Sequence, residues 1–256
     1  MAKFRPVGHE DRLSVVEHLD ELRSRIIISI SAFAVALALC FWQNHLILRI
    51  VNHPLRHYHH KPTTFGVAEP FTTTLTVSAY FAILLALPVV LYQLYSFVLP
   101  AFSPNERHVA LPLLLMVPFL FVGGAAFGYF VVIPAALKFL LHFNTDQFQV
   151  QIRARDYYGF ITLTLLSVGV VFQVPVLILA LTRLGITTPQ MLRKNRRYAF
   201  LVCAIVAAAL PGVDPVSMLL EMVPLVALYE LSILLAAAFG RPSGEASDQV
   251  AAAEGS

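Results

Sequence analysis

Residues 26–43 read IIISISAFAVALALCFWQ, an apolar run without a single charged side chain. A helix of about 20 predominantly apolar residues is long enough to cross the hydrocarbon core of a bilayer. Further apolar runs follow along the chain at 75–98, 109–133, 159–181, 198–210 and 217–239. The simplest prediction from these runs is an all-α membrane protein with six transmembrane helices.

The composition of the 256-residue chain agrees with this prediction. Hydrophobic residues make up 58% of the chain and charged residues only 13%, with a mean hydropathy of +0.73. Ordinary soluble domains carry about 25% charged residues, so the composition excludes a typical soluble enzyme, a disordered chain and a disulfide-rich secreted module. Cys40 and Cys203 both lie in apolar runs, where cysteine usually behaves as a small hydrophobic residue.

The distribution of lysine and arginine predicts the orientation in the membrane, because cytoplasmic loops carry an excess of these residues. With the N-terminus inside, twelve of the 18 fall on the cytoplasmic side and six on the outer side. Both termini are therefore expected in the cytoplasm. If 198–210 and 217–239 form a re-entrant hairpin instead of two spans, both flanks still lie on one side.

Three segments are expected along the chain. Residues 1–25 form a cytoplasmic segment in which Leu13, Val16, Leu19 and Leu22 follow one another at intervals of three, which is typical of an amphipathic helix at a membrane surface. Residues 26–239 form the transmembrane domain, and the small, polar tail 240–256 is expected to be disordered. Prolines inside the spans predict bent helices and a cupped bundle; they are Pro88, Pro112, Pro118, Pro175 and Pro224.

Polar residues inside apolar runs are costly and often functional. Gln173 interrupts the fourth run, and Glu221 lies about one and a half turns inside the sixth. Asp214, just before the sixth run, either caps that helix or has a functional role. Glu230 fits a position near the cytoplasmic interface.

No catalytic constellation is recognisable: the chain has no HExxH, GxSxG, P-loop or GxGxxG motif. The segment 53–61, HPLRHYHHK, is rich in histidine, but its basic residues would repel a metal cation, so a solvated loop is expected. The protein is therefore not expected to be an enzyme, to hold a metal or cofactor, or to bind nucleic acid.

Several stretches, taken in order, resemble TatC, the family of core subunits of the twin-arginine protein translocase. They are HLDELRSR at 18–25, PVVLYQLYSFVLPAF at 88–102 leading into Glu106 and Arg107, AFGYFVVIP at 126–134, FQVP at 172–175, GIT at 185–187 with LRKNRRY at 192–198, and PGVD at 211–214. The resemblance covers about residues 13 to 239. Any one stretch is a weak signal, whereas their succession is specific.

The resemblance implies a six-helix cupped bundle in the bacterial cytoplasmic membrane, with both termini in the cytoplasm. It implies a receptor for signal peptides with paired arginines, within an oligomeric translocase that moves folded cargo by the proton-motive force. The implied partners are the single-span subunit TatA and, as in many bacteria, TatB; whether the partner set is TatA with TatB or TatA alone stays open.

The resemblance also assigns residues. The signal-peptide site corresponds to Glu21, Arg23, Phe97, Glu106 and Arg107. Positions linked to partner docking or translocation correspond to Pro54, Phe71, Gln173 and Asp214.

Two further questions stay open at this level. Many family members carry a glutamate where this chain has Gln173, which cannot titrate, so Glu221 is a candidate replacement for the intramembrane acid. A small-molecule secondary transporter is the alternative function, because such proteins also use bent helices and buried acids.

Overall fold

The computed structural model describes residues 9–56, 61–98, 107–147, 150–183, 185–211 and 215–239. Within these ranges the chain is helical apart from its connections and one isolated β-bridge between Thr63 and Arg153. The elements are α1 (His9–Trp42), α2 (Asn44–Val51), α3 (His53–Arg56), α4 (Glu69–Val98), α5 (Arg107–Phe127), the π-helix η3 (Gly128–Val132), α6 (Ile133–His142), α7 (Ala154–Val171), α8 (Val174–Arg183), α9 (Pro189–Lys194), α10 (Arg196–Ala209) and α11 (Pro215–Phe239).

Five stretches of helix in the described ranges are long and apolar enough to cross a membrane. They are Asp20–Trp42, Glu69–Phe97, Met116–His142, Ala154–Arg183 and Pro215–Ala238. The remaining apolar run forms α10, which has 14 residues. At 1.5 Å per residue this helix extends about 21 Å, less than the roughly 30 Å of a hydrocarbon core.

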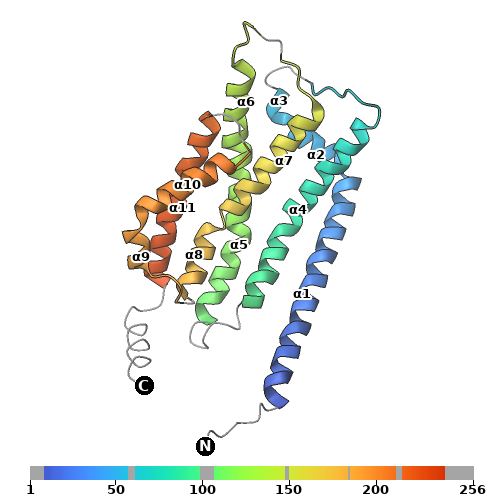
Figure 1. The fold of residues 1–256 in the computed structure, drawn as a ribbon. Coiled ribbons are helices and arrows are strands. Elements are labelled where there is room, and N and C mark those ends of the chain that lie inside the picture. The colour runs from blue at the N-terminus through green and yellow to red at the C-terminus, as the bar shows by residue number, and fades with distance from the viewer. Residues whose placement is uncertain are drawn as a thin grey trace, which may run out of the picture.

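The long helices stand side by side in one bundle (Figure 1). Helix α1 packs along α4, α4 packs against α7 and α5, and α11 packs against α8 and α10. The first residues of α1 and the last residues of α11 lie at the same end of the bundle (Figure 1). We call this the terminal end; the opposite end carries α2, α3 and the start of α7 and is called the distal end.

Helix irregularities occur close to prolines. The break between α7 and α8 falls at Phe172 and Gln173, just ahead of Pro175. Because proline has no amide hydrogen, it cannot donate to the carbonyl four residues earlier, and the residue before it is restricted as well. The π-helical stretch η3 immediately precedes α6, which has Pro134 in its first turn. Pro88 and Pro224 lie inside the continuous helices α4 and α11.

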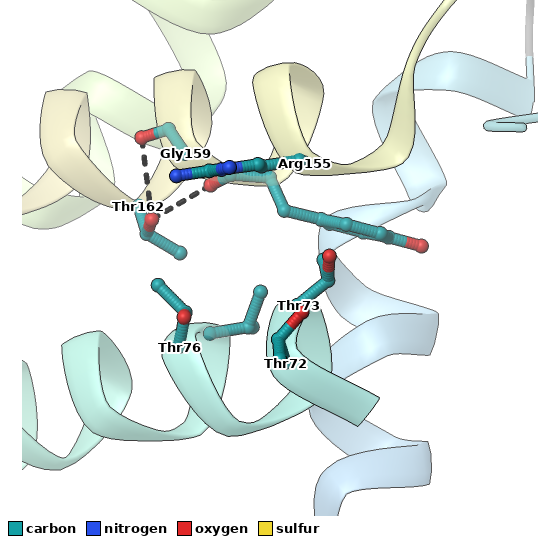
Figure 2. A pocket seen from close by; sticks show the side chains of 8 residues that line it. Thr72, Thr73, Thr76, Arg155, Gly159 and Thr162 are labelled. Atoms are coloured by element: carbon teal, nitrogen blue, oxygen red, sulfur yellow. Dashed lines mark hydrogen bonds between the residues drawn. The ribbon is translucent and has the colours of Figure 1, made fainter. Parts of the chain in front are cut away.

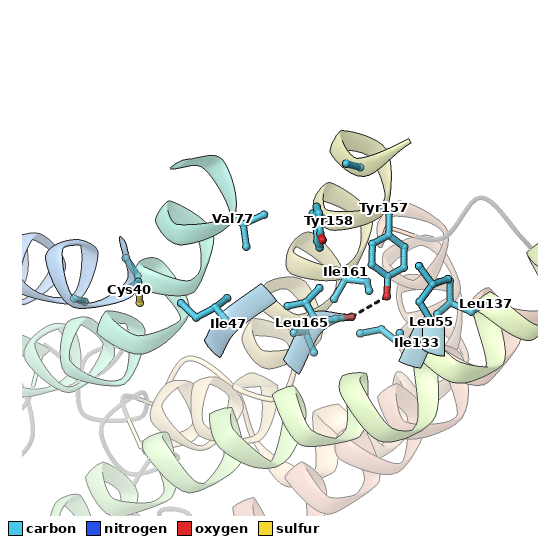
Figure 3. Close-up of a cluster of buried hydrophobic side chains, with 14 of the residues drawn as sticks. Cys40, Ile47, Leu55, Val77, Ile133, Leu137, Tyr157, Tyr158, Ile161 and Leu165 are labelled. Atoms are coloured by element: carbon cyan, nitrogen blue, oxygen red, sulfur yellow. Dashed lines mark hydrogen bonds between the residues drawn. The ribbon is translucent and has the colours of Figure 1, made fainter. Parts of the chain in front are cut away.

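The largest hydrophobic cluster lies where α2 and α3 fold back onto the bundle (Figure 3). Ile47, Val51 and Leu55 follow one another at intervals of four residues, and all three are buried. That spacing places them on one face of a helical segment, which packs against Ile133, Ile161 and other buried side chains of the same cluster. The chain at 53–56 is thus helical, and the expectation of a solvated loop beginning at His53 was wrong for these residues.

Two tyrosine hydroxyls donate hydrogen bonds to the backbone of this folded-back segment. Tyr157 donates a hydrogen bond to the carbonyl oxygen of Val51 at 2.8 Å (Figure 3), and Tyr129 donates to that of Ile50 at 2.8 Å. Both carbonyls lie in the last turn of α2, where helical carbonyls lack intrahelical partners. Val51 is fully buried, so Tyr157 supplies a hydrogen bond to a carbonyl that water cannot reach.

The two cysteines are buried and free, as expected. Cys40 belongs to the largest hydrophobic cluster, and Cys203 belongs to a separate cluster between α10 and α11. Near the terminal end, Arg196 at the start of α10 forms an ion pair with Glu230 of α11, with 2.7 Å between the charged atoms. The position predicted for Glu230, near a membrane interface, is compatible with this exposed pair.

Candidate functional site

A polar cluster joins α1 and α4 at the terminal end of the bundle. Arg25 donates from Nε to Oε1 of Glu21, one turn earlier in α1, at 3.0 Å. Its other nitrogens reach α4, where they donate to Oε1 of Gln93 at 3.1 Å and to the carbonyl oxygen of Ser96 at 3.3 Å. A single guanidinium thus has acceptors on two helices.

The sequence explains why the acceptors meet here. Glu21 and Arg25 are four residues apart, so they face the same side of α1. Gln93 and Ser96 lie in the last turns of α4, which ends at Val98. The last four carbonyls of a helix lack intrahelical donors and carry partial negative charge. This end of α4 is therefore a ready acceptor for a cation.

An apolar groove of about 240 Å³ begins beside this cluster and follows the seam between α1 and α4. Arg25 and Gln93 line it together with seven other residues, which are mainly apolar: Leu22, Ile26, Ser29, Ile30, Val90, Leu94 and Phe97. Leu94 is 55% exposed. The combination of carboxylate, carbonyls and apolar wall suits a ligand with a cationic head and an apolar continuation.

The structure brings together only part of the predicted signal-peptide set. Glu21 lies in the polar cluster and Phe97 lines the groove. Arg23, in contrast, has an exposed side chain, and the residue that forms an ion pair with Glu21 is Arg25. Glu106 lies outside the described residues. Arg107 is the first residue of α5, and only its backbone is described.

Arg25 and Gln93 are functional candidates that the sequence analysis did not assign. The spacing of four residues between Glu21 and Arg25 is a signal that could have identified the arginine. No comparable signal exists for Gln93, because it is separated from Arg25 by 68 residues. Only the packing of α1 along α4 brings the two side chains together.

Pro54 and Phe71 lie far from this cluster. Phe71 is in the first turn of α4, 61% exposed, whereas Pro54 is buried in α3. Phe71 and Phe97 are about 39 Å apart along α4 by helical rise. Pro54 and Phe71 therefore lie at the opposite end of the bundle from Glu21 and Phe97.

Gln173 lies at the α7–α8 break, 6% exposed. Its Nε2 donates to the carbonyl oxygen of Val117 in α5 at 3.2 Å, while its Oε1 has no hydrogen-bond partner among the described residues. Glu221 is 2% exposed and lines a small cavity with Phe172, next in sequence to Gln173. Both polar side chains thus face the bundle interior. Asp214 lies outside the described residues.

A further ion pair, which was not expected from the sequence, lies at the distal end. Arg153 donates from Nε to Oε1 of Glu69 at 2.7 Å, and Oε2 of Glu69 accepts from the backbone amides of Phe65 and Gly66 at 2.8 and 3.1 Å. The hydrogen bond to Glu69 raises the pKa of Arg153. The β-bridge between Thr63 and Arg153 involves the same segment, and the amide of Thr63 donates to the carbonyl oxygen of Ile152 at 2.8 Å. We call this set the distal clasp.

The part of the chain that the structure describes contains no group of three or more histidine, cysteine, aspartate or glutamate residues placed to hold a metal ion.

The fold and the site together define a class: a multi-span, all-helical membrane protein with a cation-accepting cluster and an apolar groove at one end. Residues 17–224 match the family model of the Sec-independent protein translocase protein TatC. The chain belongs to this family. It is a component of a Sec-independent protein translocase rather than a small-molecule transporter.

Relatives and solved structures agree with this membership. TatC of Carboxydothermus hydrogenoformans is 38% identical over 229 residues, which cover 89% of this chain and 94% of the relative. TatC of Desulforapulum autotrophicum is 34% identical over 250 residues, covering 96% and 92%. Two crystal structures of the twin arginine translocase receptor TatC, one of them in DDM, superimpose with TM-scores of 0.74 and 0.75 at 33% and 32% identity. Each match covers 88% of this chain and 100% of the solved one.

Proposed function

We propose that this chain is the receptor subunit of a twin-arginine translocase and that it binds the paired arginines of signal peptides where α1 meets α4. The observation that carries the proposal is the Arg25 guanidinium, which already finds Glu21, Gln93 and a helix-end carbonyl as acceptors. These acceptors have the geometry to bind a guanidinium, and we infer that they bind one from the signal peptide.

The chemistry favours arginine over lysine. A guanidinium is planar, stays charged at all relevant pH values and presents five N–H donors, whereas an ammonium is a compact point charge. Acceptors that diverge from two helices match the broad fork better than the ammonium. We propose that Glu21 receives one arginine of the signal peptide and that Glu106, the residue before α5 in the sequence, receives the other, together with the next residue, Arg107.

The apolar groove fits the second part of the ligand. Secretory signal peptides carry an apolar segment after their basic region. Leu94 and Phe97 line the groove next to the polar cluster, so a bound peptide can continue from the cluster along the seam between α1 and α4. We assign Phe97 to contact with the start of this apolar segment.

We further propose six membrane crossings in a cupped bundle, with both termini in the cytoplasm. The location of the start of α1 and the end of α11 at one end of the bundle supports an even number of crossings (Figure 1). The sequence count of lysine and arginine, twelve of 18 on the same side as the N-terminus under a six-span topology, supports a cytoplasmic location of the termini. The short helix α10 then crosses a locally thinned bilayer.

TatA, alone or together with TatB, is the proposed partner, in an oligomeric complex of the bacterial cytoplasmic membrane driven by the proton-motive force. Gln173 is the proposed docking position for a polar group of a partner helix, supported by its buried Oε1 without a partner among the described residues. Pro54, Phe71 and Asp214 are proposed to act in partner docking or translocation rather than in signal-peptide binding.

Site-specific photo-crosslinking tests the receptor proposal. A photoreactive residue replaces Leu94 in membrane vesicles, and a signal peptide with paired arginines is compared with the same peptide carrying paired lysines. A probe at Leu85, which is 57% exposed on the same helix but outside the groove, is the matched control. We expect a crosslink from position 94 with the arginine peptide only. Equal crosslinking of both peptides, or none, would overturn the assignment.

A further inference from the structure

A pocket of about 300 Å³ lies at the distal end between the first turns of α4 and α7. Its lining combines hydroxyl groups with one cation (Figure 2). Threonines 72, 73 and 76 come from α4, while Arg155, Tyr158 and Thr162 come from α7. This pocket is separate from the terminal cluster and from the distal clasp.

The hydroxyls of this pocket are not equivalent. Thr162 donates to the carbonyl of Tyr158 at 2.6 Å (Figure 2), and Thr72 donates to that of Ala68 at 3.1 Å, so both protons are used within their own helices. Thr73 is 5% exposed, yet its Oγ1 has no hydrogen-bond partner among the described residues. A buried hydroxyl without a partner costs free energy, which a ligand in the pocket would recover.

The charge of the lining is positive. Arg155 is the only charged residue in it, and no aspartate or glutamate lines the pocket among the described residues. The nearby carboxylate of Glu69 is engaged by Arg153 and by two backbone amides. Arg155 is therefore available to an anion from outside the protein.

We propose that this pocket binds a phosphate group and that the group is the headgroup phosphate of a phospholipid. The Arg155 guanidinium and the Thr73 hydroxyl both line this pocket, and together they offer several donors to the acceptor oxygens of a phosphate. The location favours a lipid as its source, because the membrane-spanning stretches Glu69–Phe97 and Ala154–Arg183 both begin here. The pocket thus lies at the level where headgroups meet the hydrocarbon core, with Val77 on its apolar side.

Native mass spectrometry of the purified full-length chain in detergent tests this proposal. The protein is titrated with phosphatidylglycerol, with diacylglycerol of the same chains, which lacks the phosphate, and separately with inorganic phosphate. We expect retention of phosphatidylglycerol but not of diacylglycerol. Arg155→Gln should lower the affinity about tenfold and Thr73→Val about threefold, because a charge-assisted hydrogen bond contributes more than a neutral one.

Matched variants guard against general effects. Thr74→Val makes the same change on the same helix outside the pocket, where Thr74 donates to the carbonyl of Pro70. Arg49→Gln removes an exposed arginine elsewhere. Both should bind lipid within about twofold of the parent protein. Thermal melts confirm that each variant folds; if Arg155→Gln does not, Thr73→Val alone still decides.

The outcomes separate the possible sources. Lipid binding that is equal in the parent protein, Arg155→Gln and Thr73→Val would overturn the proposal. Binding of inorganic phosphate with the same dependence on these variants, without retention of phosphatidylglycerol, would overturn the lipid assignment and identify a site for free phosphate.

Discussion

Gly124 of α5 and Gly169 of α7 are packed so closely that a Cβ on Gly124 would lie 3.0 Å from the Cα of Gly169. The same Cβ would lie 2.7 Å from Cγ of Phe172. A Cβ on Gly169 would in turn lie 2.7 Å from Cε2 of Phe121. Small residues let transmembrane helices approach closely, and here the contact fixes α5 against the helix that ends at the Gln173 break.

Gly124→Ala and Gly169→Ala are therefore expected to destabilise the protein. Adding a methyl group to a filled interface forces side chains or backbone to shift, at a cost of about 1–3 kcal/mol. The measurement is thermal unfolding in detergent. Gly123→Ala is the matched control, since nothing lies within 4 Å of its added Cβ. A melting temperature for Gly124→Ala equal to that of Gly123→Ala would contradict the packing described.

Glu21→Gln is expected to weaken binding of a twin-arginine peptide about tenfold, because hydrogen bonds to charged groups contribute roughly 1.5–3 kcal/mol. Its melting temperature should change little, since a partly exposed pair four residues apart in a helix contributes about 0.3–0.5 kcal/mol. Peptide affinity in nanodiscs measures the effect. Asp20→Asn, a change at an exposed neighbour on α1, serves as control and should bind as the parent protein does. Equal affinities for Glu21→Gln and Asp20→Asn would rule out Glu21 as an acceptor.

The distal clasp predicts an order of stabilities. Glu69→Ala removes the acceptor of Arg153 and of the amides of Phe65 and Gly66, whereas Arg153→Ala leaves the carboxylate with both amides. The Glu69 variant should therefore melt at the lower temperature of the two. Arg49→Ala, which loses an exposed charge elsewhere, should melt as the parent protein does. A lower melting temperature for Arg153→Ala than for Glu69→Ala would mean that the ion pair contributes more to the stability of the distal clasp than the amide contacts do.

Gln173→Leu separates stability from function. The substitution loses the hydrogen bond to Val117 but also removes a buried oxygen without a partner among the described residues. These effects oppose each other, so the melting temperature should shift by only a few degrees. If the polar group serves a partner helix, cargo export should fall strongly in the same variant. Unchanged export in vivo would remove Gln173 from the docking positions.

The helical architecture was predictable because a bilayer requires long apolar helices whatever their packing. The short helices α2 and α3 were missed, although the spacing of Ile47, Val51 and Leu55 contained the signal. The histidines that follow at 53–60 obscure that period of four. Gly124 and Gly128 are four residues apart, a spacing of small residues that suits close helix packing, and Gly124 does pack closely against Gly169 and Phe172.

The site was only partly predictable. The resemblance assigned Glu21 and Phe97, which the structure places in the polar cluster and the adjoining groove, and local spacing was sufficient to pair Glu21 with Arg25. The contacts of Arg25 with Gln93, of Arg153 with Glu69 and of Tyr157 with Val51 join residues 68, 84 and 106 positions apart. The sequence by itself determined which segments are apolar helices and which residues share a helix face, because both depend on local periodicity. Only the tertiary structure decided which faces meet, because that choice depends on how all the helices fill the bundle together.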